Sequence, residues 1–226
     1  MGLINFSQIT DGTGIDAADV NSPLNTIYND YNGNVDDSNI SASANIAGSK
    51  LASGGVDSTK INFGGAGAGI WWEEIGRTTL AIAGDTITVS SLAARKYLKV
   101  YMISTATGGT TNGNITFNGD VGANYAARVS ANGAADATAS AQTSLGLFQA
   151  AAADDKFFVA EIVNISTKNK ILQGTMMQQN STTAPGRLEF AAVWVNTSAQ
   201  ISSITLTNTG TGDFAIGSEI IVLGHN

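Results

Sequence analysis

Short runs in which every second residue is apolar fill the chain from Trp71 to the C-terminus, and this period constrains the fold more than any other feature. In one such run, the apolar residues of a single face are Leu188, Phe190, Ala192 and Trp194. A period of two places alternate side chains on one face of a β-strand, whereas an α-helix has a period of 3.6. The runs therefore predict strands that each bury one face.

Turn-forming residues such as Ala83-Gly84-Asp85 and Pro185-Gly186 separate these runs. We predict strands at residues 74–83, 85–90, 97–103, 113–118, 125–130, 144–149, 156–165, 170–179, 187–196, 201–208 and 218–223. The alanine run at 150–153 is compatible with one helical turn. Many short strands without a long helix are typical of two-sheet folds. We therefore predict an all-β chain in which residues 71–226 form a jelly-roll-like β-sandwich head.

A different pattern precedes the head, where single aliphatic residues recur at intervals of five or six: Ile40, Ile46, Leu51, Val56 and Ile61. This interval fits neither a helix nor a strand. One apolar side chain in five does not offset the entropy of ordering the backbone, roughly 1–2 kcal/mol per residue, unless copies of the chain pack beside it. We interpret residues 39–63 as an extended shaft of intertwined chains, with a flexible linker as the alternative. The glycine-rich residues 64–70 predict a hinge.

Residues 1–38 have the features of a small separate module. Ser22-Pro23 is a favourable helix start, with the serine as N-cap. Leu24, Ile27, Tyr28 and Tyr31 then fall on one helical face, and Asn32-Gly33 ends the helix. A helix of about ten residues is unstable alone in water, so we expect this face to pack on a partner. The partner is a larger assembly, the same helix in sister chains, or an internal mini-core with the preceding segment, which contains Phe6 and Ile9.

Composition excludes several functional classes. Charged residues are 13% of the chain, the formal net charge is −7, and the 11 lysines and arginines are scattered. Nucleic-acid binding needs a basic face that neutralises phosphates, so we expect no nucleic-acid partner. No segment approaches the roughly 20 apolar residues of a membrane span, so we expect no membrane insertion.

Catalytic and metal-binding chemistry is sparsely represented. The chain has no cysteine, and its single histidine, His225, is the penultimate residue. Adjacent acids such as Glu73-Glu74 point to opposite faces of a strand, whereas glycoside hydrolysis needs two carboxylates across one sugar. This argument does not exclude a catalytic pair formed by two acids from distant strands. Turns such as Gly119-Asp120 offer oxygen ligands but lack the spacing of a calcium loop. We predict no catalytic residue, no metal site and no cofactor.

Aromatic residues are the remaining candidates for contacts. Trp71-Trp72 follows the hinge, and an indole at this place can pack under the head or face a sister chain or a sugar. Tyr101 and Tyr125 are candidates for the outer faces of their strands. We therefore assign Trp71, Trp72, Tyr101 and Tyr125 as candidate glycan or inter-chain contacts.

Three segments carry a resemblance to a known group of proteins: FSQITDGTGIDAADVNSPLNTIYNDYNGNVDDSNI, IAGSKLASGGVDSTKI and WWEEIGRTTLAIAGDTITVSSLAARKYLKVYMI. In these segments the chain resembles structural proteins of tailed bacteriophages, of the fibre-like and head- or tail-decorating kind. The resemblance implies a homotrimer whose axis is formed by Ile40, Ile46, Leu51, Val56 and Ile61. It also implies attachment to capsid or tail proteins of the virion through Phe6, Ile9, Leu24, Ile27, Tyr28 and Tyr31.

The resemblance implies a non-enzymatic structural component of a bacteriophage virion. A chain of 226 residues with few shaft repeats is short for a host-recognising tail fibre. This favours a head fibre, a decoration protein or a short adaptor on the capsid or tail surface. The alternative is a carbohydrate-binding module that recognises a host-surface glycan, and a third reading is a polysaccharide-degrading spike.

Overall fold

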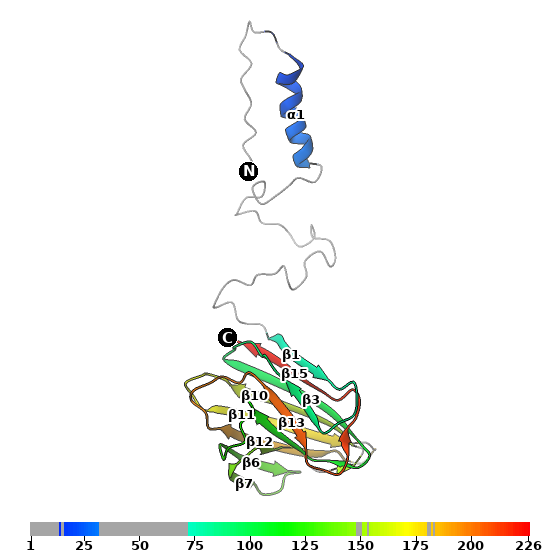
Figure 1. Ribbon diagram of the computed structural model, residues 1–226, viewed down its shortest axis with the longest axis vertical. Helices are drawn as coiled ribbons and strands as arrows, with labels where there is room; N and C mark the ends of the chain where they lie inside the picture. The colour runs from blue at the N-terminus through cyan, green and yellow to red at the C-terminus, as the bar shows by residue number, and fades with distance from the viewer. Residues whose placement is uncertain are drawn as a thin grey trace. The chain divides into compact units, whose positions relative to one another are not determined.

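A computed structural model of the chain describes residues 14, 16–31, 72–147, 151–152, 154–179, 182 and 184–226. The chain divides into two units, Met1–Asn62 and Phe63–Asn226. In the first unit, the described residues form the helix α1 (Ala17–Tyr31). The second unit contains the strands (Figure 1). The predicted shaft at 39–63 and the predicted hinge at 64–70 lie outside the described residues.

Helix α1 begins earlier than Ser22-Pro23 predicts. Its first residue is Ala17, and the Asp16 carboxylate accepts a hydrogen bond from the Ala18 N–H at 2.7 Å, so Asp16 is the N-cap. Pro23 consequently lies inside the helix, where it has no N–H to donate. Asp16 and Ser22 are both good N-cap residues, and the local sequence does not decide between them. Leu24 and Tyr28, two of the residues expected on the apolar face, are 55% and 66% exposed.

The second unit consists of antiparallel strands, and the large sheet runs across most of it (Figure 1). Its order is β1 (Glu73–Thr79), β15 (Glu219–His225), β3 (Tyr97–Thr107), β10 (Asp155–Val163), β11 (Lys170–Gln179), β12 (Gly186–Trp194), β6 (Tyr125–Ala131) and β7 (Ala137–Gln142). Strand β14 (Asp213–Phe214) also pairs with β3. The small sheet has the order β2 (Thr86–Val89), β13 (Ile204–Asn208), β5 (Gly113–Phe117) and β8 (Leu145–Gly146). Strands β4 (Thr110–Thr111) and β9 (Ala151–Ala152) form a separate pair. This arrangement confirms the predicted all-β class.

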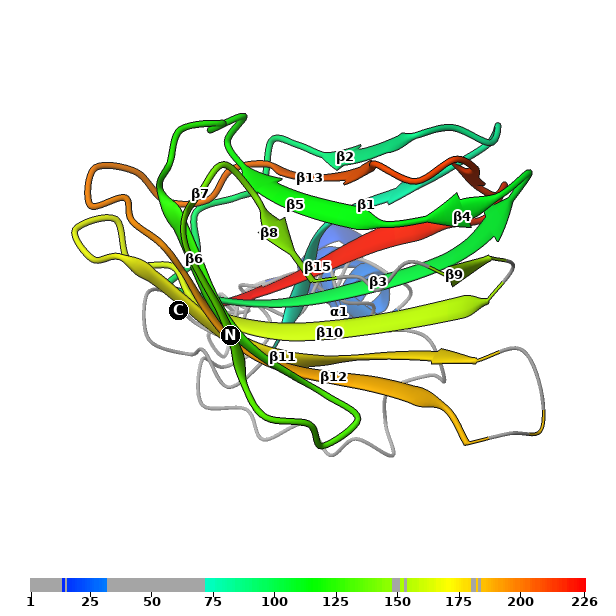
Figure 2. The ribbon, with the colours of Figure 1, turned by 90° about the horizontal axis from the view of Figure 1, so that it is seen from below.

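The two sheets form two layers, with the small sheet lying over part of the large one (Figure 2). Buried side chains fall at every second position along β3, β5 and β12, as the sequence period predicts. They meet in one apolar core, whose members include Leu98, Val100, Met102, Phe158, Phe190, Trp194, Ile220 and Val222 from the large sheet and Ile87, Val89, Ile115, Phe117, Ile204 and Leu206 from the small sheet. In these three strands, alternation therefore determines which face is buried.

Two hairpins widen the large sheet. Strands β11 and β12 pair with each other, as do β6 and β7, and all four lie on the far side of β10 from β3. The small sheet ends at β8 and gains no matching strands. The large sheet therefore presents a broad outer face over β10, β11, β12 and β6.

Three expectations about individual elements are wrong. Part of the alanine run at 150–153 is not helical, because β9 pairs with β4. The strand predicted at 74–83 ends at Thr79. Strand β7 was not predicted because all six of its residues are exposed, so its sequence lacks the two-residue apolar period.

The two sheets are joined at one end by the side chain of Tyr125, which is 1% exposed. Its hydroxyl accepts a hydrogen bond from the Phe117 N–H at 3.0 Å and donates one to the Asp120 carbonyl at 2.9 Å. Its ring stacks on Trp194 with 6.4 Å between centroids. Burial raises the pKa of Tyr125 to about 12. The prediction that Tyr125 contacts a glycan or another chain is therefore wrong, because its side chain lies in the core.

Candidate functional site

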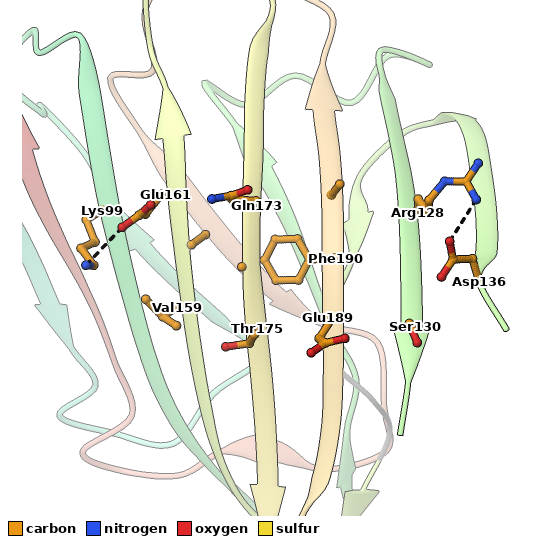
Figure 3. A pocket seen from close by; sticks show the side chains of 13 residues that line it. Lys99, Arg128, Ser130, Asp136, Val159, Glu161, Gln173, Thr175, Glu189 and Phe190 are labelled. Carbon is orange, nitrogen blue, oxygen red and sulfur yellow. Dashed lines mark hydrogen bonds and ion pairs between the residues drawn. The ribbon is translucent and has the colours of Figure 1, made fainter. Parts of the chain in front are cut away.

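A groove of about 570 Å³ crosses the outer face of the large sheet over β10, β11, β12 and β6 (Figure 3). One row of paired residues runs through it at right angles to the strands: Lys99, Glu161, Gln173, Ala191 and Arg128. This row spans five strands, from β3 to β6. Four strand intervals of about 4.8 Å give it a length of roughly 19 Å.

The charged side chains of the groove lie in ion pairs (Figure 3). The pairs are Lys99–Glu161 at 3.3 Å, Arg128–Asp136 at 3.1 Å and, at the rim, Arg187–Glu189 at 3.6 Å. The exposed fractions of these side chains range from 28% to 62%. Solvent-exposed pairs of this kind contribute only about 0–1 kcal/mol to stability. Their polar atoms are therefore accessible to a ligand.

Neutral polar side chains lie between the ion pairs. Gln173 stands in the row just described, and the next row contains Thr175, Glu189 and Ser130. The Ser130 hydroxyl donates a hydrogen bond to the Ala134 carbonyl at 2.9 Å. The side chains of Gln173 and Thr175 have no hydrogen-bond partner in the part of the chain that the structure describes. An amide and a hydroxyl are therefore available at the centre of the groove.

Gly174 forms the floor of the groove beside the ring of Phe190. A methyl group at this position would overlap the carbonyl oxygen of Val159 and lie 2.7 Å from the Phe190 ring. Phe190 itself stacks on Phe158 in the core, with 5.2 Å between ring centroids. The missing side chain lets β10 and β11 approach closely, and the edge of a core aromatic ring reaches the groove.

Two aromatic rings line an adjoining hollow of about 390 Å³. Trp72 and Tyr97 are 40% and 41% exposed. The His225 ring is 5.7 Å from the Trp72 ring and 6.0 Å from the Tyr97 ring, measured between centroids. Lys99 lies 6.0 Å from the Trp72 centroid, within cation–π distance. The Trp72 indole therefore packs against both His225 and Lys99. The hollow shares Glu161 and Gln173 with the groove, so the two depressions adjoin at these residues.

The predicted contact residues have separate locations. Trp72 lies in the hollow, while Trp71 is outside the described residues. Tyr101 is on the outer face but in the row next to the ion pairs, where its ring stacks on Phe157 at 6.2 Å. It does not line the groove. Tyr101 pairs with the groove residue Val159, whereas Trp72 lies 6.0 Å from Lys99 and lines the adjoining hollow.

The other predicted site residues belong to the first unit. The predicted trimer axis, at Ile40, Ile46, Leu51, Val56 and Ile61, lies outside the described residues, and so do Phe6 and Ile9. Leu24, Ile27, Tyr28 and Tyr31 belong to α1. Both the trimer axis and the virion anchor stay predictions.

The acidic residues considered as sites have other partners. Glu73 pairs with Arg95 at 2.5 Å, whereas Glu74 pairs with Arg77 at 2.9 Å. The Asp120 carboxylate accepts hydrogen bonds from the Trp194 indole at 2.7 Å, from the Gly122 N–H at 2.8 Å and from the Asn124 amide at 2.9 Å. The indole hydrogen bond is the main reason that the pKa of Asp120 lies below its usual value. Asp120 therefore connects its turn to the core residue Trp194 by a hydrogen bond.

Sequence reasoning missed the residues that form the groove. Alternation places Glu161, Gln173 and Arg128 on outer strand faces, which is the signal that could have suggested them. It does not tell which strands are neighbours, and these three residues come from β10, β11 and β6. The row exists only because the register aligns them.

The described residues contain no group of three or more His, Cys, Asp or Glu side chains placed to hold a metal ion. Within the same residues, no helix is both long and apolar enough for a membrane span. Comparison of the chain with profiles of known families, with curated proteins and with solved structures found no match.

Proposed function

We propose that the chain is a non-enzymatic structural protein of a bacteriophage virion: a trimeric fibre or decoration protein that displays a jelly-roll-like head. The observation that carries this proposal is the order of eight strands. In chain order these are β1, β2, β3, β5, β8, β10, β13 and β15. The first, eighth, third and sixth are adjacent in the large sheet, and the second, seventh, fourth and fifth form the small sheet. Two Greek keys folded in this way are the jelly roll of viral capsid proteins and lectins.

The exposed apolar face of α1 supports the proposed anchor. Val20 and Leu24 lie one turn apart and are 45% and 55% exposed. The head, by contrast, encloses a core of its own. An exposed apolar helix face gains free energy when a partner covers it. The capsid or tail surface is the partner that the sequence resemblance implies.

Two measurements test this proposal. The first is quantitative mass spectrometry of density-banded particles from the virus that encodes the chain. We expect the chain at a stoichiometry comparable with that of known structural proteins, and its absence from the particles would refute a virion location. The second is the light-scattering mass of the purified chain. We expect three times 23.1 kDa, and a monomer would refute the trimer.

The groove supports a second candidate, a carbohydrate-binding head. Together with the adjoining hollow, it combines two exposed aromatic rings, Trp72 and Tyr97, with the polar side chains of Glu161 and Gln173. Sugar rings have an apolar C–H face and a rim of hydroxyl groups, which match this combination. A glycan array probed with the full chain tests this candidate. Absence of binding to every glycan would reject it.

A further inference from the structure

We propose that the groove and its adjoining hollow bind an uncharged oligosaccharide, oriented with one sugar on Trp72 and Tyr97 and the following sugars along the row from Glu161 to Arg128. This inference rests on the carbohydrate-binding candidate above. It adds the direction in which the oligosaccharide lies along the site and the charge class of the ligand.

The location of the groove sets it apart from the eight-strand framework. Its walls are built largely by β11, β12 and β6, the strands that the two hairpins add to the large sheet. The inner faces of β11 and β12 contribute Leu172, Phe190 and Trp194 to the core, and their outer faces widen the surface on which the groove lies. Binding sites are commonly carried by such additions to a rigid scaffold.

The charge of the groove selects the ligand class. Each of its three carboxylates, from Glu161, Asp136 and Glu189, has a basic partner within 3.6 Å. The lining contains three acids and two bases, and Arg187 at the rim supplies the third base, so this surface has no formal net charge although the whole chain carries −7. A polyanionic glycan would find no unpaired cation among these groups, and a cationic ligand no unpaired carboxylate. Hydroxyl groups can donate to the carboxylates and accept from the guanidinium groups without separating the pairs.

The shape of the groove selects an elongated ligand that starts at an aromatic platform. The row from Lys99 to Arg128 extends roughly 19 Å over four strand intervals, which exceeds the size of one sugar ring. The two exposed rings lie at one end of this path, where His225 is within 6.0 Å of both. Gln173 belongs to both the groove and the hollow, so its free amide is placed where the platform meets the polar row.

The test uses the full chain on an array of uncharged, sialylated, uronic-acid and sulfated oligosaccharides, followed by calorimetry with the best ligand. The variants are Trp72→Ala and Gln173→Ala. The control is Ile216→Ala, which removes a 69% exposed apolar side chain that lines neither depression. Gln173→Ala keeps the test valid should Trp72→Ala impair folding, because the Gln173 side chain is exposed. Thermal unfolding of every variant checks that the head is intact.

We expect binding to uncharged oligosaccharides, with an affinity that changes little as the ionic strength rises, since screening acts on net charges. Trp72→Ala and Gln173→Ala should each weaken binding at least tenfold, and Ile216→Ala should leave it unchanged. Retained affinity in both groove variants, or binding confined to acidic glycans, would overturn this inference while leaving carbohydrate binding established. Absence of binding to all glycans would overturn both. Neither outcome bears on the virion location, which the particle analysis tests separately.

Discussion

The hydroxyl of Tyr125 links the large sheet to Phe117 in the small sheet and to the Asp120 turn by two hydrogen bonds, and Tyr125→Phe removes both of them. In Tyr125→Phe, the buried Phe117 N–H loses its acceptor and the Asp120 carbonyl loses a donor. The ring remains, so its stacking on Trp194 is retained. Leaving a buried polar group without its hydrogen bond costs about 1–3 kcal/mol. We expect this decrease in the free energy of unfolding at about pH 8, where a free tyrosine is neutral.

The same hydroxyl makes the difference in the free energy of unfolding between the wild type and Tyr125→Phe depend on pH. The pKa of Tyr125 is about 12 in the folded head, whereas its ordinary value is 10.0. Between these values the folded state keeps the proton that the unfolded state releases, so the stability of the wild-type head falls as pH rises. Two pKa units correspond to at most about 2.7 kcal/mol. The phenylalanine variant lacks this dependence, so the stability difference should shrink from pH 10 to pH 12.

Urea unfolding of the full chain, followed by tryptophan fluorescence, measures both the decrease in the free energy of unfolding in Tyr125→Phe and its dependence on pH. Titrations at about pH 8, 10 and 11.5 are required for the wild type, for Tyr125→Phe and for the control Tyr101→Phe, which removes a hydroxyl from the outer face. Groups that two of these proteins share cancel in the difference between them. A Tyr125→Phe penalty below 0.5 kcal/mol, or one that stays constant up to pH 11.5, would show that this hydroxyl does not join the sheets.

Three further changes have defined outcomes. In Asp120→Asn, loss of the charged acceptor should cost about 1–3 kcal/mol at neutral pH. Because the folded-state pKa of Asp120 is lowered, this stabilisation is present above the ordinary carboxyl pKa of 3.8 and is lost below it, so the two proteins should converge in acid unfolding titrations. Gly174→Ala should destabilise the head by about 1–3 kcal/mol, because the methyl group overlaps the Val159 carbonyl. Gly84→Ala is its control, since a methyl group there meets no atom within 4 Å, and equal thermal shifts in both variants would contradict the argument. Leu51→Glu should reduce the light-scattering mass from trimer to monomer without changing head unfolding, and an unchanged mass would refute the apolar axis.

Much of the head was predictable because strand faces follow from a local period. The run that ends at Trp194 predicted a buried face, and Leu188, Phe190, Ala192 and Trp194 are all buried in β12. Tyr125 was placed incorrectly although the same signal was present: it shares a strand face with Ala127 and Val129, which pack against the core. Strand β7 could not be found in this way, because a strand with no buried face has no apolar period.

By itself, the amino-acid sequence determined the β class of the head, the buried face of most strands and the amphipathic pattern of the helix. These properties depend on residues two to four positions apart, whose side chains share a face through backbone geometry alone. Only the tertiary structure decided which strands are neighbours and in what register. Lys99, Glu161, Gln173 and Arg128 come from four strands and form one row because β3, β10, β11, β12 and β6 pair in that order. Pairing order depends on how the whole core packs, and no local period carries that information.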